Sequence, residues 1–373
     1  MRFGIEAGAW SNPRGYGRFL RGLSSALSRR GRHEWVLALD EVTAGGLGEA
    51  SGTPPRVVIA TGHAASAGAA TEHHRSLSEM FRMSRGLSRG RFDAILFPSP
   101  LTYVPVRGTP EFLVLHDVTA ERHPELVFES PAAARRWRWK TKIGLRRASR
   151  VLTVSEHSRR GIAEVYGIDS GRIHVIPEAA DPIFFEPSRP GRRRPRPYLL
   201  FVGGLSPHKN ISVVVEALKS APEVDLVLAG PFETDVFHAQ DAAALVASSG
   251  LASRVERVSD PDDAALRDLY SGALALVLPS LDEGFGLPAI EAAAAGTPSI
   301  LSNSTGAAER LGGSALLFDP CNPEQLASHV RSLLEDPERR AALGAQARRS
   351  AALLDWDQAA AVVEETLEGA LKI

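Results

Sequence analysis

Short, continuously apolar runs constrain the fold of this chain more than any other feature. LLFVGG (199–204) and LALVLPS (274–280) show no polar alternation, which is typical of a strand covered on both faces, as in a parallel sheet. Stretches with a helical pattern follow such runs, among them Ser155–Tyr166, Asn210–Ser220 and Pro288–Ala295. Repeated alternation of strand and helix predicts an α/β protein with doubly wound, Rossmann-like sheets.

The expected strands are spread over the whole chain. They are Arg2–Ile5, Val36–Leu39, Val57–Ala60, Ala94–Pro98, Phe112–His116, Val151–Ser155, Leu199–Gly203, Leu226–Gly230, Val255–Val258, Leu274–Pro279 and Ser299–Leu301.

A proline- and arginine-rich segment, Pro182–Pro197, interrupts this pattern. Proline lacks an amide donor and disfavours helix before it, so the segment is interpreted as an interdomain linker whose arginines are either solvated or contact a phosphate. The 373 residues are enough for two domains, predicted at 1–186 and 187–355. Two doubly wound domains would place their strand ends on one cleft, where such folds bind ligands.

Composition excludes several classes of protein. The 43 Lys and Arg residues against 44 Asp and Glu leave a formal charge of -1, so nothing indicates a nucleic-acid partner. A single cysteine, Cys321, excludes a disulfide framework and a cysteine metal site within the chain. The N-terminus lacks the apolar core of a signal peptide, and no apolar run reaches membrane-spanning length. The sequence predicts a cytoplasmic protein.

The segment 276–305 carries the most chemical information. After a strand ending at Pro279, a loop with glycines leads to Pro288, which suits the first turn of a helix and marks an anion site at its N-terminus. Glu283 and Glu291 flank this site. Each acid alone has a simpler explanation, because Glu283 could be a solvated loop acid and Glu291 could complement the helix dipole. Together they suit sugar hydroxyls, since a carboxylate can accept two of them.

Four segments together resemble a known family. Glu283 and Glu291 form a Glu-x7-Glu pair. YLLFVGGLSPHKNISVVVEAL, RVLTVSEHSRRGIAEVYGIDSGRIHVIPEAAD and LLFDPCNPEQLASHVRSLLEDPERRAALG are similar to other parts of the same pattern. The chain resembles the retaining glycosyltransferases of the GT-B fold, family 4 type. The likeness is dense from Val151 to about Trp356 and looser before it. It also implies that a final helix, about 356–373, crosses back to the N-terminal domain, as the amphipathic DWDQAAAVVEETLEGAL suggests.

The resemblance implies donor-binding roles in the second domain. Glu283 would bind hydroxyls of the transferred sugar, Glu291 the ribose, and Lys209 the diphosphate. A lysine at a helix start opposes the helix dipole, which itself argues for a bound anion. His208 stands where many members have Arg and would add a second cation. The backbone around the site would come from Gly203, Gly204, Gly284, Phe285, Gly286 and Leu287.

The first domain offers a second set of candidates. Gly15 and Gly17 resemble the family's glycine pair near the diphosphate, with Tyr16 between them on the acceptor side. His116 and Asp117 end an apolar strand and resemble a His-Asp pair in which the His lies beside the transferred sugar and the Asp faces the acceptor. The simpler alternatives are turn glycines without a ligand and a histidine satisfied within its loop.

Two further segments have a functional and a structural explanation each. Asp260, Asp262 and Asp263 could hold a cation, but they more readily cap a helix beginning near Ala264. The basic stretch Arg135–Arg147, with two tryptophans, could contact an anionic membrane surface. Alternatively, it is a solvated helix whose tryptophans pack on the sheet.

The expected function is transfer of a sugar from a nucleoside-diphosphate sugar to an acceptor hydroxyl on a glycan, a lipid-linked glycan or a small molecule. The resemblance implies retention at the anomeric carbon, an α-linkage, no metal and no cofactor, with His116, Glu283 and Lys209 as the catalytic residues. Two alternatives stay open: a sugar-nucleotide epimerase or hydrolase of the same fold, and a non-catalytic protein that binds sugar nucleotides.

Overall fold

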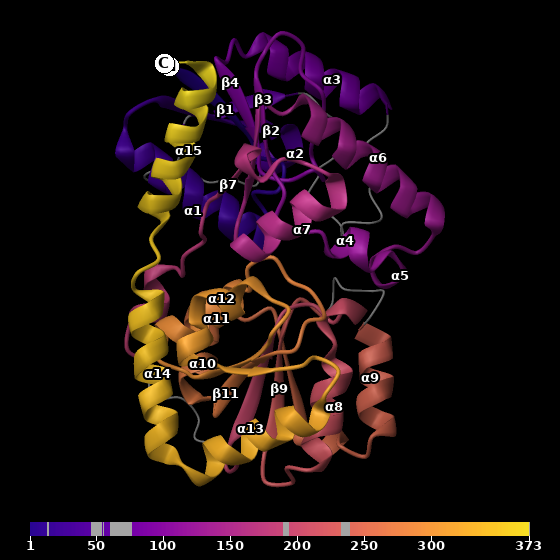
Figure 1. Cartoon of the computed structure of the whole chain (residues 1–373), viewed down its shortest axis with the longest axis vertical. Helices are drawn as coiled ribbons and strands as arrows, with labels where there is room; N and C mark the ends of the chain where they lie inside the picture. The colour runs from indigo at the N-terminus through magenta and orange to yellow at the C-terminus, as the bar shows by residue number, and fades with distance from the viewer. Residues whose placement is uncertain are drawn as a thin grey trace. The chain divides into compact units, whose positions relative to one another are not determined.

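The structure is a computed structural model that describes residues 1–12, 15–45, 54, 56–59, 77–188, 194–232 and 239–372 (Figure 1). The chain forms two compact units. Unit 1 consists of Met1–Glu178 and Asp355–Ile373, and unit 2 consists of Ala179–Leu354. The α/β fold with two doubly wound sheets is confirmed, and the C-terminal helix belongs to unit 1 as expected.

Unit 1 contains a seven-stranded parallel sheet with the order β3-β2-β1-β4-β5-β6-β7. Its strands are β1 Arg2–Glu6, β2 Glu34–Asp40, β3 Arg56–Ile59, β4 Ala94–Phe97, β5 Glu111–Val114, β6 Arg150–Thr153 and β7 Ile173–Val175. The central strands β1, β4 and β5 are buried along nearly their whole length. Apart from Arg2, Glu6 and Glu111 their residues are apolar, as expected for strands covered on both faces.

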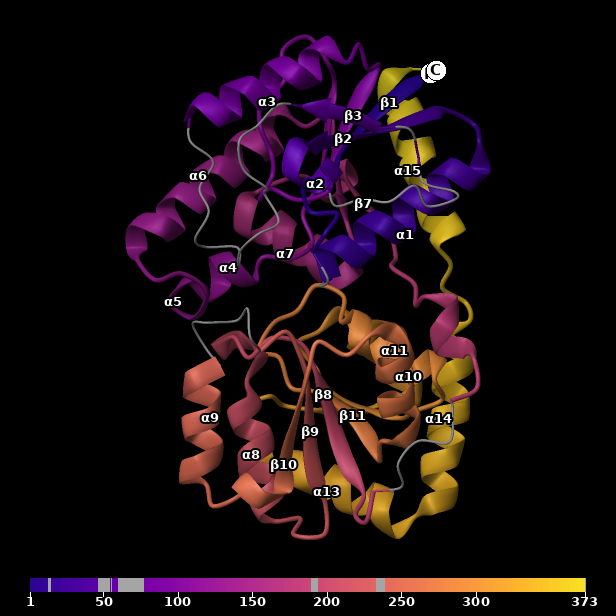
Figure 2. The same cartoon turned by 180° about the vertical axis from the view of Figure 1, so that it is seen from behind.

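Helices cover both faces of this sheet. They are α1 Gly15–Arg30, α2 Glu41–Gly45, α3 Leu77–Arg89, α4 Thr119–Arg122, α5 Pro124–Val127, α6 Pro131–Arg147, α7 Glu156–Tyr166 and α15 Trp356–Leu371, with the 3-10 turn η1 Ser170–Arg172. Met83 and Leu87 of α3, Leu145 of α6 and Ile162 of α7 share one apolar cluster with the sheet. Helices α1 and α15 lie side by side in both views (Figures 1 and 2).

The contact between α1 and α15 is apolar at its centre. Trp356 stacks on the bare backbone of Gly22, where a Cβ atom would lie 2.4 Å from the indole ring. Its ring also meets Phe19 edge-on at 5.9 Å. Ala359, Val363 and Leu367 follow on the buried face of α15. This spacing of one helical turn places them on a single stripe, which explains why the amphipathic segment returns to unit 1.

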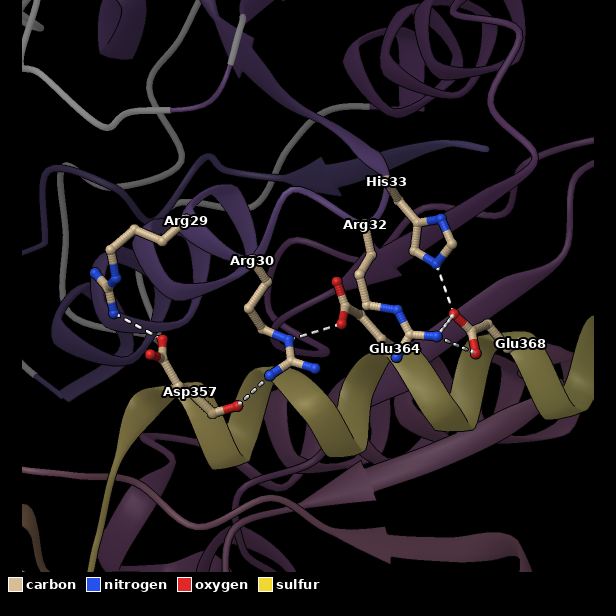
Figure 3. Close-up of polar contacts among 7 residues, drawn as sticks. All are labelled: Arg29, Arg30, Arg32, His33, Asp357, Glu364 and Glu368. Carbon is tan, nitrogen blue, oxygen red and sulfur yellow. Dashed lines mark hydrogen bonds and ion pairs between the residues drawn. The ribbon is translucent and has the colours of Figure 1, made fainter.

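Ion pairs flank this apolar contact (Figure 3). Arg30 Nε contacts Glu364 Oε2 at 2.8 Å, and the Glu364 side chain is 0% exposed. Arg29 pairs with Asp357 at 2.9 Å in a more exposed position. Arg32 and His33 share the carboxylate of Glu368. The helix α15 is therefore fixed along its length by the end of α1 and the loop that follows it.

Unit 2 contains a six-stranded parallel sheet with the order β10-β9-β8-β11-β12-β13. Its strands are β8 Tyr198–Val202, β9 Asp225–Gly230, β10 Val255–Ser259, β11 Ala275–Leu278, β12 Ser299–Ser302 and β13 Leu316–Phe318. Its helices are α8 Ile211–Lys219, α9 Ala239–Ser248, α10 Asp263–Gly272, α11 Leu287–Ala294, α12 Gly306–Leu311, α13 Pro323–Glu335 and α14 Pro337–Ala351. Short 3-10 turns lie at η2 Pro182–Phe185, η3 Pro207–Lys209, η4 Ala252–Arg254 and η5 Gly312–Ser314.

Both sheets reverse their strand order next to the first strand of the unit. In unit 1 the reversal lies between β1 and β4, and in unit 2 between β8 and β11. Open α/β sheets bind ligands at the carboxyl ends of the strands at such a switch point. The topology therefore predicts a ligand site in each unit, at the loops after β8 and β11 in unit 2 and at those after β1 and β4 in unit 1.

Two features of the fold differ from the sequence prediction. The edge strands β7 and β13 were not expected; each has three residues, too few to show a period. The predicted boundary at 186/187 falls inside unit 2, because η2 packs on α10 and α11. At the other end, unit 2 closes at Leu354, next to the predicted boundary at 355/356.

The described arginines of the predicted linker are not simply solvated. The guanidinium of Arg194 donates two hydrogen bonds to the carboxylate of Glu256. It also lies over the ring of Tyr198. Arg196 donates to the carbonyl of Pro222. These contacts fix the start of β8, so the arginines have a structural role in unit 2. Residues 189–193 of the linker lie outside the described residues.

Candidate functional site

The loops at the switch point of unit 2 are tied together by backbone hydrogen bonds. Gly203, directly after β8, donates from its N–H to the carbonyl of Ala229 at 2.9 Å. Leu281, after β11, donates to the carbonyl of His208 at 2.9 Å. The loop 203–206, which includes Gly204, leads directly into η3, which carries His208 and Lys209. The two segments predicted to bind the donor are therefore neighbours.

Lys209 and Glu283 form the charged centre of this site. Lys209 Nζ contacts Glu283 Oε1 at 2.8 Å, with side-chain exposures of 23% and 15%. Ser280 Oγ donates to Glu283 Oε2 at 2.7 Å. Burial alone would raise the pKa of Glu283, but Lys209, Ser280 and the charge of His208 together lower it. Glu283 is therefore an ionised, partnered acid, and the alternative of a solvated loop acid is wrong.

The ion pair supplies the anion that a lysine near a helix start favours. The carboxylate of Glu283 provides it from within the protein. The position of Lys209 is consequently explained without a ligand. Because an ammonium has three donors, the contact with Glu283 leaves it chemically able to hold a phosphate oxygen as well.

Helix α11 begins where the sequence predicted. Gly286 is its N-cap with φ of +85°, a left-handed conformation that favours glycine, and Pro288 lies in the first turn. A Cβ atom at Gly286 would also lie 2.8 Å from Leu278 and 2.9 Å from Ala307. Phe285 and Leu287 are buried, whereas Gly284 belongs to the turn between Glu283 and the helix. The glycine thus allows the helix N-terminus to start close against β11.

Glu291 lies inside the helix rather than at its end. It is only 2% exposed, and its Oε2 accepts a hydrogen bond from the hydroxyl of Tyr270 at 2.8 Å. No acidic residue occupies the first turn of α11. Since the dipole effect is confined to the end turns, the explanation of Glu291 as a dipole-complementing acid is wrong. Tyr270, from α10, is instead its partner.

The carboxyl edge of the unit 1 sheet carries a second cluster, around His116. The ring Nε2 lies 3.0 Å from the carbonyl of Pro98, after β4, and Nδ1 lies 3.4 Å from Glu178 Oε1, after β7. Tyr16 and Phe19 of α1 meet the ring edge-on at 4.8 and 4.7 Å. His116 is therefore held on several sides within unit 1.

The other candidates of unit 1 lie close to this histidine. Burial raises the pKa of Tyr16, and the charges of Asp117, Glu121 and Glu178 raise it further. Asp117 Oδ1 accepts from the amide of Thr119 at 3.0 Å. Gly15 starts α1 and has open space around it, whereas a Cβ at Gly17 would lie 1.8 Å from the carbonyl of Asn12. Packing inside the turn is thus sufficient to require glycine at 17.

Three site residues escaped the sequence analysis: Ser280, Tyr270 and Glu178. Ser280 precedes the Glu-x7-Glu pair and could have been noticed as a polar residue at a strand end. Tyr270 and Glu178 carry no local signal, because each meets its partner only through the fold.

The remaining predicted features have structural explanations. Asp262 is the N-cap of α10, accepting from Ala265 N at 2.7 Å, so the capping interpretation is confirmed. Within the described ranges, no group of three or more His, Cys, Asp or Glu is placed to hold a metal ion. Likewise, no described helix combines the length and hydropathy needed to cross a bilayer.

The two tryptophans of α6 point to different surroundings. Trp137 Nε1 donates to Glu121 Oε1 at 2.7 Å, and its ring packs near Phe128. Trp139 is 70% exposed. The alternative in which the tryptophans pack on the sheet is therefore wrong for Trp139, which lies at the surface of a helix without acidic residues; the contacts of Trp137 are with Glu121 and Phe128.

Each half of the chain matches the model of a known protein family. Residues 13–184 match Glycosyltransferase Family 4, and residues 184–350 match Glycosyl transferases group 1. The D-inositol 3-phosphate glycosyltransferase of Kineococcus radiotolerans is 33% identical over 250 residues, which are 59% of this chain and 56% of that protein. The chain thus spans little more than half the length of that relative.

Solved structures share the fold at lower identity. Sucrose-phosphate synthase from Thermosynechococcus elongatus has a TM-score of 0.79 and 20% identity, with 98% of each chain covered. Anabaena HepE, solved in complex with UDP-glucose, has a TM-score of 0.75 and 19% identity, covering 99% of this chain and 100% of that one. The two family matches adjoin at residue 184 and together cover residues 13–350. The chain therefore belongs to the glycosyltransferases of the family 4 type (glycosyl transferases group 1) and has the GT-B fold.

Proposed function

We propose that this protein is a glycosyltransferase that moves a sugar from a nucleoside-diphosphate sugar to an acceptor hydroxyl. The observation that carries the proposal is the Lys209–Glu283–Ser280 group at the switch point of the unit 2 sheet, followed directly by the N-terminus of α11. A cation, a carboxylate and helix amides in one place suit a ligand that combines a diphosphate with a sugar.

Different groups of unit 2 would bind the diphosphate, the transferred sugar and the ribose of the donor. Lys209 and the amides at the start of α11 would hold the diphosphate, with His208 as a second cation and the backbone of Gly203 and Gly204 close by. Once the diphosphate shares the ammonium of Lys209, Glu283 can accept hydroxyls of the transferred sugar. Glu291 would accept the ribose hydroxyls, because a carboxylate that accepts one bond from Tyr270 retains further lone pairs.

The reaction breaks the bond between the anomeric carbon and the diphosphate oxygen and forms one to the acceptor oxygen. The acceptor attacks from the face that the diphosphate leaves, which retains the anomeric configuration and gives an α-linkage from an α-linked donor. A leaving-group oxygen takes the acceptor proton. Lys209 and the α11 amides stabilise the charge that grows on the diphosphate. Since these groups carry that charge, we expect turnover without metal or cofactor.

The first unit would supply the remaining groups. His116 would lie beside the transferred sugar, Gly15 and Gly17 near the diphosphate, and Tyr16 and Asp117 on the acceptor side. The HepE structure with UDP-glucose supports a nucleoside-diphosphate sugar as donor class. We keep a glycan, a lipid-linked glycan and a small molecule as acceptor classes, since one relative is named for D-inositol 3-phosphate and another, from Salmonella typhimurium, is named an O-antigen chain mannosyltransferase.

We further propose that α6 contacts an anionic membrane surface from the cytoplasmic side. Its exposed residues Arg135, Arg138, Trp139, Lys142 and Arg146 recur at helical spacing and form one stripe. Basic residues around an exposed tryptophan suit the interface of anionic lipids. Lys142→Glu should weaken sedimentation with anionic vesicles, whereas Arg310→Glu, an exposed change in unit 2, should not. Equal binding of both variants would refute this contact.

The function is tested by incubating the protein with nucleoside-diphosphate sugars, with and without a panel of acceptors. A transferase releases the nucleoside diphosphate and forms a glycoside only when acceptor is present, and the anomeric coupling constant of the product reports retention. Product without acceptor would indicate an epimerase or hydrolase. Donor binding without any product would indicate a non-catalytic binder. Repeating the assay with a chelator tests the expected independence from metal.

A further inference from the structure

We propose that Asn210 is a positioning residue of the donor site, which fixes the two loops that carry Lys209 and Glu283 relative to each other. The inference rests on the proposed function, in which Lys209 holds the diphosphate and Glu283 the transferred sugar. Asn210 itself does not touch the donor in this proposal. It acts through the backbone next to Lys209 and next to Ser280.

The backbone of Asn210 turns the chain from η3 into α8. It has the left-handed conformation, with φ of +55° and ψ of +42°, which Asn adopts more readily than most residues other than Gly. Its N–H donates to the carbonyl of Pro207 at 2.9 Å and closes η3. Lys209 is therefore the last residue before a fixed turn.

The side chain of Asn210 does not have the role that is usual for Asn at a helix start. Such an Asn accepts from the first amides of the helix, but within the described chain Asn210 makes no such bond to α8. Its Nδ2 instead donates to the carbonyls of Pro279 at 3.2 Å and Pro320 at 2.8 Å. Ser212 Oγ donates to Oδ1 at 3.0 Å, which leaves Nδ2 for the carbonyls. Both amide donors are thus used between segments of the chain.

These bonds join segments at the carboxyl ends of three strands. Asn210 ends the segment between β8 and α8, Pro279 directly follows β11, and Pro320 lies after β13. The N–H of Leu281 donates to the carbonyl of His208 at 2.9 Å, which joins the first two segments a second time. The loops after β8 and β11 are therefore linked at two points, one through a side chain and one through the backbone.

The bond between Asn210 and Pro279 connects the residues next to the charged centre. Lys209 precedes Asn210, and Ser280, whose hydroxyl donates to Glu283, follows Pro279. The ion pair of Lys209 and Glu283 is partly exposed, so it holds the loops only weakly. A bound diphosphate would also share the ammonium of Lys209. A neutral amide bonded to two carbonyls keeps the loops in place when that exchange occurs.

The first test measures hydrogen exchange of single amides by NMR in the parent protein and in Asn210→Gly. Glycine adopts the same left-handed backbone, so the variant loses only the side chain. The Leu281 amide should exchange about tenfold faster in the variant, the equivalent of one lost hydrogen bond. The amide of Leu276, which donates to the carbonyl of Pro298 at 3.0 Å within the sheet, should keep its rate. An unchanged rate at Leu281, or equal acceleration of both amides, would overturn the proposal.

The second test separates positioning from loss of stability. Asn322→Ala is the matched control, because Asn322 also starts a helix of unit 2 but caps it in the usual way, accepting from Gln325 N at 3.0 Å. Asn210→Gly should lower kcat by about tenfold to a hundredfold, since slightly misplaced groups react more slowly. Asn322→Ala should lower the melting temperature and leave kcat unchanged. An equal loss of kcat in both variants would overturn the role of Asn210.

Calorimetry adds a readout that a partly unfolded sample does not mimic. Titration with UDP, or with GDP where UDP does not bind, should show weaker binding to Asn210→Gly with the stoichiometry of the parent. Loss of folded protein would lower the stoichiometry and leave the affinity unchanged, and that result would contradict positioning. Hydrogen exchange needs neither nucleotide nor acceptor, so it tests the link between the loops even if no sugar transfer is found. The two proposals can therefore fail separately.

Discussion

The two sheets have the same relative strand order apart from the additional edge strand β7 in unit 1, but the charged side chains at their carboxyl edges differ in burial. In unit 2, Lys209 and Glu283 meet on long side chains that keep partial access to solvent. In unit 1, His116 and Glu178 are nearly fully buried and held by a carbonyl and two aromatic rings. Accessible charges can exchange partners when a ligand arrives, whereas buried ones keep their geometry. The first arrangement suits capture of a polyanion and the second suits fixed orientation of a reacting group.

The largest effect is expected for Arg30→Ala, which should affect unit 1 alone. Removing Arg30 leaves the fully buried Glu364 without its ion-pair partner, which typically costs about 3–5 kcal/mol of unfolding free energy. Arg29→Ala, which breaks the exposed pair with Asp357, should cost about 1 kcal/mol or less. Denaturant unfolding of both variants measures the difference. Equal losses would show that burial of Glu364 does not set the strength of this contact.

Glu283→Ala should reduce turnover by about 10²–10³ while the fold survives, because the proposed sugar contact strengthens in the transition state. Affinity for the nucleoside diphosphate should be retained or increased, since Lys209 loses its competing partner. Steady-state kinetics and calorimetry measure the two quantities. Ser280→Ala, which removes only one hydrogen bond to Glu283, is the milder control. Turnover within threefold of the parent would exclude the role of Glu283.

Glu291→Ala should weaken binding of the nucleoside diphosphate by about tenfold, the typical loss for a hydrogen bond to a charged group. Tyr270→Phe keeps the carboxylate and removes only its internal partner, so a smaller loss is expected. Calorimetric titration of both variants with the sugar-free nucleotide decides between ribose binding and a purely structural contact. If both variants bind like the parent, Glu291 serves only the packing of α10 on α11.

His208→Arg should alter how donor affinity depends on pH. A free imidazole titrates near pH 6.5, and a bound diphosphate favours its charged form. Parent affinity should then fall as pH rises from about 6 to 8.5, while the variant stays constant and equal or tighter. The location of His208 beside the proposed donor site supports this prediction, because its charge helps to lower the pKa of Glu283. Parallel profiles would leave the diphosphate to Lys209 and the loop amides.

The smallest effect concerns acid stability. Because its partners lower the pKa of Glu283 in the fold, its stabilising contribution is complete above the unfolded pKa of about 4.3. It is lost as pH falls through the lower folded value. The parent should therefore lose stability more steeply than Glu283→Gln below about pH 4.3. Coinciding pH profiles would mean that the Lys209 contact contributes nothing in solution.

The sequence predicted the fold well where the signal is local. The central strands are long apolar runs, and Ser155, Asp262 and Pro288 mark helix starts in agreement with the structure. The edge strands β7 and β13 were missed because three residues show no period. The charged centre of unit 2 was found from motifs, but the bond between Lys209 and Glu283 joins residues 74 apart. Glu178 could not be found at all, because only the fold brings it to His116.

The position of α15 has a consequence for synthesis of the protein. A nascent chain emerges from the ribosome with its N-terminus first, and domains tend to fold as they appear. Unit 2 is complete once Leu354 has emerged, but unit 1 still lacks α15. Until then the face of α1 around Gly22 and Phe19 is without the tryptophan that covers it. The half of the protein made first is therefore the half that is finished last, and a premature stop would spare unit 2 while exposing the apolar surface of unit 1.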